Sequence, residues 1–271
     1  MDIKDLYWEI GINAGFLDFS CEWLMERKEQ GYDMSHFSFY GSPGLLWDGG
    51  REVHDEAEFD RYVSFISFLN EMGIGFNVTA QNLFISSNML KNERSNTFME
   101  ILNKTNLNGV IILKDILKDY VKDKCPNLKT ISSINKAYIE QGIHSSASWY
   151  KSIFSNFDYC VINGNDMYDF ELLNSLEPKK RMIILINEYC ARDCIDRSYH
   201  IAIKSMRMFK EFDFLSKELM SELRCSGVRC GLLLPKENLE KYFNIGIDHF
   251  KIQARESTFE TFKKILKKYF D

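Results

Sequence analysis

Short apolar runs alternate with longer amphipathic segments along most of the chain. The runs are rich in β-branched and aromatic residues and have the length of buried strands. They lie at 36–40, 75–80, 109–113, 128–134, 158–162, 181–186, 228–234 and 249–253. The run at 228–234 is the weakest, because Gly231 and the following Pro235 interrupt its pattern.

The segments between these runs have the hydrophobic period of a helix. Phe59, Val63, Ile66 and Leu69 recur at intervals of three and four residues, as on one face of an amphipathic helix. The same spacing predicts helices over 56–72, 88–103, 115–124, 146–156, 167–176, 198–223, 236–244 and 258–270.

Strands that alternate with helices indicate parallel pairing through right-handed crossovers. Eight such units predict a closed (β/α)₈ barrel of the TIM type, and these barrels commonly contain about 250 residues. The alternative is a doubly wound open sheet, but the first run is not followed by the GxGxxG turn of that fold. No Pro/Gly/Ser-rich linker divides the chain, so we expect a single barrel domain over 1–271 with a short N-terminal extension over 1–34.

Composition narrows the classes of partner. A hydrophobic content of 45% in 271 residues supports one large core. The net charge of −5 disfavours nucleic acid and anionic membranes as partners. The N-terminal stretch has acids where a signal peptide needs basic residues, and no apolar run reaches the roughly 18 residues of a spanning helix. We therefore expect a soluble cytoplasmic protein.

Polar residues follow several of the predicted strands. The carboxyl ends of barrel strands form the reactive face of the fold. Amides and cations at these ends suit a small polar substrate, and the residues predicted to bind it are Asn82, Asn135, Asn163, Arg197 and Arg255. The alternative is that polar residues end these strands only because they begin turns.

The segment 187–200, NEYCARDCIDRSYH, concentrates reactive side chains in the loop after the sixth predicted strand. Cys190 and Cys194 form a C-x₃-C pair, and Cys225 and Cys230 form a C-x₄-C pair near the next unit. Clustered thiolates select zinc or iron–sulfur centres. We predict Cys190, Cys194 and Cys230 as ligands, with Cys225 or His200 as a fourth or one iron left open to substrate. The alternative is that these are free thiols.

Three residues of this loop are predicted to act on substrate. Glu188 directly follows the strand and is the candidate acid or base. Asn187 beside it would hold the substrate. His200 could shuttle protons near neutral pH or bind metal.

The C-terminal segment 232–257, LLLPKENLEKYFNIGIDHFKIQARES, resembles the closing unit of the collagenase-like peptidase family. The matching positions are Pro235, Glu237, Gly246, Ile247, Phe250, Lys251, Ile252 and Arg255. Ala254 stands where that family has glycine. The segment 127–138 and the cysteine loop are also similar to the family. The resemblance implies a barrel and, as in several members, a [4Fe–4S] cluster that supports oxygen-independent hydroxylation of tRNA, rRNA or ubiquinone precursors.

The chain also departs from this family. It lacks the longer Gly/Arg/Ser-rich cysteine segment of the RNA-modifying members, and Glu177 stands thirteen residues before Cys190 where cysteine would match the ubiquinone-pathway members. No HExxH or GxSxG motif indicates a peptidase.

Three classes of function therefore stay open. The first is an iron–sulfur oxidoreductase or hydroxylase acting on a small molecule. The second is a metal-independent lyase or isomerase, and the third is a zinc-stabilised subunit of a hetero-oligomer. A homo-oligomer is also compatible with the sequence.

Overall fold

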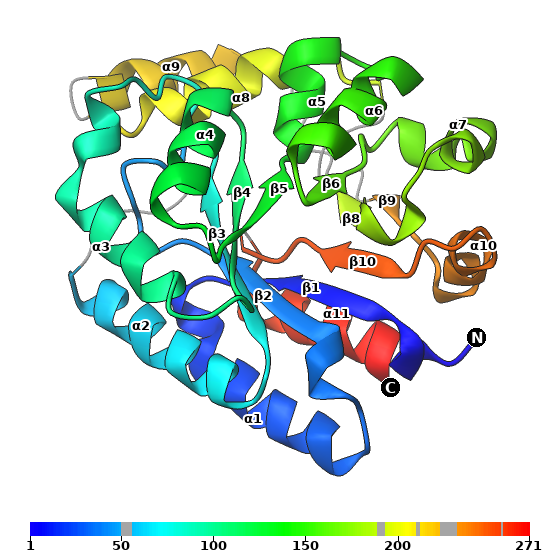
Figure 1. Ribbon diagram of the computed structural model, residues 1–271. Coiled ribbons are helices and arrows are strands. Elements are labelled where there is room, and N and C mark those ends of the chain that lie inside the picture. Colours follow the sequence, from blue (N-terminus) through cyan, green and yellow to red (C-terminus); the bar gives the residue numbers. More distant parts are fainter. Residues whose placement is uncertain (50–55, 189–192, 210–211, 223–231, 256) are drawn as a thin grey trace.

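The computed structural model describes residues 1–49, 56–188, 193–209, 212–222, 232–255 and 257–271. Its centre is a closed barrel of eight parallel strands in the order β1-β10-β7-β6-β5-β4-β3-β2 (Figure 1). The strands are β1 (Tyr7–Gly11), β2 (Phe37–Gly41), β3 (Gly75–Ala80), β4 (Gly109–Ile112), β5 (Lys129–Ser132), β6 (Tyr159–Val161), β7 (Met182–Leu185) and β10 (His249–Ile252). The predicted TIM-type barrel is confirmed.

Helices connect successive strands and pack around the barrel (Figure 1). They are α1 (Leu17–Glu29), α2 (Glu56–Glu71), α3 (Glu93–Leu102), α4 (Asp115–Lys124), α5 (Ile134–Gln141), α6 (Ala147–Asn156), α7 (Phe170–Ser175), α8 (Arg197–Met206), α9 (Asp213–Glu222), α10 (Leu239–Asn244) and α11 (Phe259–Phe270). Side-chain caps begin α3, α6 and α11, where Asn92, Ser146 and Thr258 each accept a hydrogen bond from a first-turn backbone N–H. Within the described residues, no helix has the length and apolar character needed to cross a membrane.

The structure differs from the sequence interpretation in two strands. Tyr7–Gly11, expected in an N-terminal extension, is the barrel strand β1 and pairs with β2 and β10. Glu9 faces the barrel interior and breaks the apolar run, which is why the pattern hides this strand. In the segment 228–234, the described strand is β9 (Leu232–Leu233), which lies outside the barrel and pairs antiparallel with β8 (Asn187–Glu188). The cysteine loop therefore follows the seventh barrel strand, not the sixth.

The barrel interior is apolar on one side and charged on the other. Ile111, Ile131, Val161, Ile183 and Leu185 belong to one buried cluster, and they come from four adjacent strands, β4 to β7. The opposite wall, formed by β1, β2, β3 and β10, carries polar and charged side chains. The two halves give the interior a low-dielectric wall facing a row of paired charges.

The charged wall is built from cross-strand partners. Glu9 and Lys251 are opposite each other in the β1–β10 register, and their side chains form a buried ion pair at 2.5 Å. Asn77 on β3 donates to the second oxygen of Glu9 at 2.7 Å. Both charges are thus neutralised and hydrogen-bonded, as burial requires.

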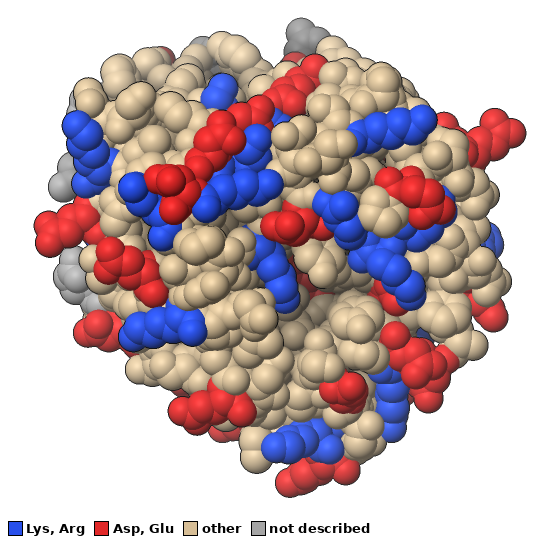
Figure 2. Space-filling view, in the orientation of Figure 1, with Lys and Arg blue, Asp and Glu red and all other residues tan. Residues whose placement is uncertain are grey.

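Helix α8 closes over the carboxyl end of the barrel. Ile201 packs into the interior cluster, and the Ser205 hydroxyl accepts a hydrogen bond from the backbone of Leu83 at 3.1 Å. Ser198 donates to the carbonyl of Tyr138 on α5 at 2.9 Å. Acidic and basic side chains are interspersed on the face shown in Figure 2, which is hollowed near its centre.

Candidate functional site

Three of the amides predicted to bind substrate are buried and hold loops together at the carboxyl end. Asn82 donates to the Leu46 carbonyl and accepts from Phe84 N–H, both at 2.9 Å. Asn187 donates to the Gln253 carbonyl at 2.7 Å and accepts from its N–H at 2.6 Å. Asn187 thereby ties β8 to the end of β10.

Asn163 has the same kind of role after β6. Its amide donates to the Ile143 carbonyl at 3.0 Å, and its oxygen accepts from Asn165 N–H at 3.1 Å. Each of the three amides thus donates and accepts at least one hydrogen bond within the protein. Substrate binding by Asn82, Asn163 and Asn187 stays a prediction.

Asn135 differs from these amides because its oxygen is open. Its nitrogen donates to Gln81 Oε1 at 2.6 Å. The buried Oδ1 has no hydrogen-bond partner among the residues that the structure describes. A buried acceptor without a partner costs about 1–3 kcal/mol, so this amide is the one best placed to accept a hydrogen bond from a ligand.

Arg255 is buried beside an acid that sequence reasoning missed. Its guanidinium donates to Thr79 Oγ1 at 2.8 Å and lies 3.7 Å from Asp48 in the loop after β2. Thr79 in turn donates to Asp48 at 2.6 Å. Arg255 and Lys251 lie 5.4 and 3.5 Å from the centre of the Tyr40 ring. Asp48 therefore balances the charge of Arg255 inside the barrel mouth.

Glu188 and Arg197, predicted separately, form one buried ion pair. The Arg197 guanidinium lies 4.3 Å from the centre of the Tyr138 ring, and Tyr138 donates to Glu188 Oε2 at 3.4 Å. Gly164 leaves room for this carboxylate, because a Cβ atom there would lie 2.0 Å from Glu188 Oε2. The pair joins β8 to the first turn of α8.

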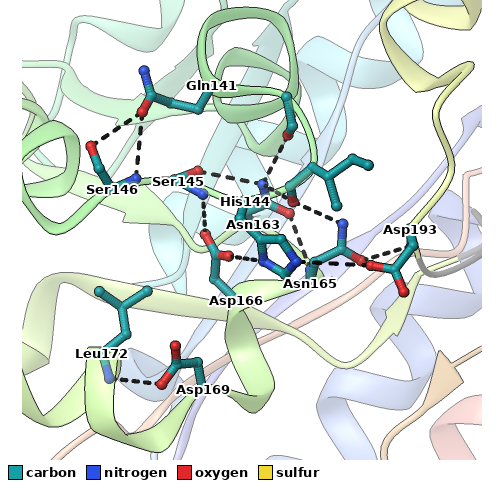
Figure 3. Close-up of polar contacts among 12 residues, drawn as sticks. Gln141, His144, Ser145, Ser146, Asn163, Asn165, Asp166, Asp169, Leu172 and Asp193 are labelled. Carbon is teal, nitrogen blue, oxygen red and sulfur yellow. Dashed lines mark hydrogen bonds and ion pairs between the residues drawn. The ribbon is translucent and has the colours of Figure 1, made fainter.

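A histidine–aspartate pair, His144 and Asp166, also lies on the carboxyl face (Figure 3). The side chain of Asp166, only 2% exposed, accepts hydrogen bonds from His144 Nδ1 at 2.9 Å, Ser145 N–H at 2.9 Å and Tyr150 O–H at 2.8 Å. The His144 side chain is 63% exposed. Because the carboxylate accepts from Nδ1, the neutral imidazole carries its proton there and presents Nε2 as an acceptor.

The histidine side chain faces the cysteine loop. His144 Nε2 lies 4.0 Å from Asp193 Oδ1, and Asp193 N–H donates to Asn165 Oδ1 at 3.1 Å. Burial and the Asp166 carboxylate raise the pKa of Tyr150 well above its usual value, so Tyr150 stays a hydrogen-bond donor. Sequence reasoning missed this cluster because its members come from two loops and α6, without a motif spacing.

Only some of the residues predicted to bind a metal or cluster are among those that the structure describes. Cys194 is a half-buried free thiol that follows Asp193, a residue in the left-handed backbone region at φ 58°. Cys190, Cys225 and Cys230 lie outside the described residues. His200 lies in the first turn of α8 and is half-buried. Among the described residues, no group of three or more His, Cys, Asp or Glu side chains has the arrangement of a metal site.

No family model and no curated protein matches the chain. Among solved structures, the U32 peptidase Mk0906 aligns over 93% of this chain and 94% of its own length, with a TM-score of 0.57 and 9% identity. A GH5_18 protein from Streptomyces cattleya aligns over 73% and 67%, with 11% identity and a TM-score of 0.34, which is too low to carry an argument. The chain thus has a TIM-type barrel fold similar to that of a U32 peptidase, the family whose closing unit its sequence resembles.

Proposed function

We propose that this chain is a barrel enzyme that acts on a small polar substrate at the carboxyl end of the strands. In this proposal His144 transfers a proton, and the cysteine loop holds an iron–sulfur cluster. The observation that carries the proposal is the His144–Asp166 pair, an exposed imidazole oriented by a buried carboxylate directly beside the loop that contains Cys194. An oxygen-independent hydroxylation or a related redox reaction is the class that fits both groups.

The proton-transfer role follows from the geometry of Asp166. Three donors fix its carboxylate, so the imidazole of His144 is held in one orientation with Nε2 toward the loop. A carboxylate that orients a histidine and stabilises its protonated form is the arrangement used in general acid–base catalysis. His144 would accept a proton at Nε2 from a substrate hydroxyl or water and return it in the second half of the reaction.

The described thiol fits the proposed cluster. Cys194 is free and half-buried, and the residue before it, Asp193, is held to the carboxyl face by its hydrogen bond to Asn165. Cys190, Cys225 and Cys230 would supply the other thiolates, with His200 as an alternative ligand. When bound, a [4Fe–4S] cluster supplies redox chemistry or an iron with an open coordination position.

Anaerobic purification tests the cluster. We expect about four iron and four sulfide per chain, and loss of most of both in Cys190→Ala and Cys194→Ala. Cys21→Ala, a matched change in a half-buried thiol on α1, should keep the full content. One zinc per chain would favour a zinc-stabilised subunit, and a metal-free chain would favour a lyase or isomerase; either result would overturn the cluster.

Nitrogen-15 NMR tests the predicted tautomer of His144 without any substrate. At alkaline pH, His144 should carry its proton on Nδ1, and Asp166→Asn should shift the population toward the Nε2–H tautomer because the charged acceptor is lost. His36 is an internal control, since its Nδ1 lies 3.0 Å from the carbonyl of Lys4 on another part of the chain. An Nε2–H tautomer of His144 in the unsubstituted protein would contradict the proposed role.

A further inference from the structure

The amino end of the barrel contains a cavity, at the opposite end from the site described above. It has a volume of about 340 Å³ and lies among the amino ends of β1, β2, β3, β5, β6 and β10. Both basic and acidic side chains lie around the hollow at the centre of the face in Figure 2. The amino end of a TIM-type barrel normally serves stability, so an open cavity here calls for a separate explanation.

Four rings line part of this cavity. Tyr7 stacks at a tilt on His36 with ring centres 4.3 Å apart, and His249 lies 6.2 Å from Tyr7 and 5.8 Å from Tyr159. Burial is the main reason that the pKa of His249 is lowered to about 4, so this ring is neutral at physiological pH. These faces provide a surface that favours a planar apolar group.

The charges around the cavity leave one cation without a matched acid. Lys180 forms an ion pair with Asp248 at 2.5 Å. The Lys129 ammonium donates to the Leu107 carbonyl at 3.3 Å, and it has no ion pair within 4.0 Å among the described residues. Asp158, the acid whose field acts on Lys129, already accepts hydrogen bonds from the backbone and hydroxyl of Thr130.

Burial lowers the pKa of Lys129, which means that its charged form lacks full compensation. An ammonium has three donors, and a carboxylate in the cavity would accept from those that the Leu107 carbonyl does not use. A ligand with a single negative charge would therefore best balance the charge of Lys129.

We propose that the amino-end cavity binds a small planar carboxylate, with the carboxylate on Lys129 and the planar body against the rings of Tyr7, Tyr159 and His249. The site is separate from the proposed reaction at the carboxyl end. It requires neither a cluster nor His144, so its test is independent of the proposed function.

Benzoate is a suitable probe because it combines one carboxylate with one ring. Trp8 lines the cavity, and we expect benzoate to change the tryptophan fluorescence in a saturable way. Lys129→Gln should weaken binding at least about tenfold, because it removes a charge-assisted hydrogen bond. Lys264→Gln, on the exposed face of α11, is the matched control and should leave the affinity unchanged.

A second variant protects the test against a folding defect. Ser38→Leu places an apolar side chain in the cavity while Lys129 is kept, and it should also abolish benzoate binding. Benzyl alcohol should bind at least about tenfold more weakly than benzoate, since it lacks the negative charge. The proposal would be overturned by unsaturable benzoate signals, by equal affinity in Lys129→Gln, or by inorganic phosphate binding where benzoate does not.

Discussion

Charged side chains inside the barrel lie at positions where a search for apolar runs predicts no buried residue. Glu9 and Asp48 are fully buried, and each faces a cation from the end of the chain, Lys251 and Arg255. Removing one partner of such a pair leaves the other charge buried and costs about 3–5 kcal/mol, although the intact pair contributes little net stability. These residues therefore fix how the barrel closes more than how stable it is.

The half-buried imidazole of His249, which lines the amino-end cavity, predicts a pH dependence of stability. Its pKa is about 4 in the folded protein and about 6.5 in an unfolded chain, chiefly because of burial. Between these values the unfolded chain binds the proton and the folded protein does not, so the free energy of unfolding falls as pH is lowered from 6.5 to 4. Above 6.5 the contribution of His249 is fully present.

Chemical denaturation across this pH range measures the effect. His249→Gln should lower the loss of stability between pH 6.5 and pH 4 by about 1–3 kcal/mol relative to the unsubstituted protein. Tyr159→Phe, which alters a neighbouring ring that does not titrate in this range, should keep the original slope. If the free energy of unfolding changed equally with pH in His249→Gln and in the unsubstituted protein, the pKa of His249 would be the same in the folded and unfolded chains, which would contradict the prediction.

At the scale of elements, strands with uninterrupted apolar runs were predictable, whereas β1, whose run is broken by the inward Glu9, was not. The runs at 109–113 and 181–186 contain β4 and β7, because strands covered on both faces are apolar throughout. β1 was missed because Glu9 is compensated by Lys251, a residue almost the whole chain away. Such long-range compensation cannot be read from a local window.

The sequence predicted where the candidate site lies in the barrel, but not how its residues contact one another. The rule that barrel chemistry lies at the carboxyl ends placed Glu188 and Arg197 in it, but their mutual ion pair depends on α8 folding back over the mouth. His144 and Asp166 were missed because the loop before α6 and the loop after β6 meet only in the folded barrel. Contacts between two loops, such as the one between His144 and Asp166, cannot be predicted from the spacing of residues within either loop.

At the scale of the whole molecule, the two ends of the barrel have different chemistry. The carboxyl end combines the His144–Asp166 pair, the Glu188–Arg197 pair and the start of the cysteine loop. The amino end contains an open cavity with aromatic walls and the cation Lys129. Both ends depend on the same closure, in which β1 is hydrogen-bonded to β10 and β2.

Removing residues 1–12 tests this closure directly. The deletion takes away β1 with Glu9 and exposes unpaired edges on β2 and β10, while Lys251 loses its buried partner. We expect the shortened chain to lose its cooperative thermal transition and to bind a hydrophobic dye, as collapsed but unpacked chains do. Removing only residues 1–4 keeps all of β1 and should preserve the cooperative transition. A chain without residues 1–12 that still unfolds cooperatively would mean that the N-terminal segment is an extension after all, and that the barrel closes without Glu9.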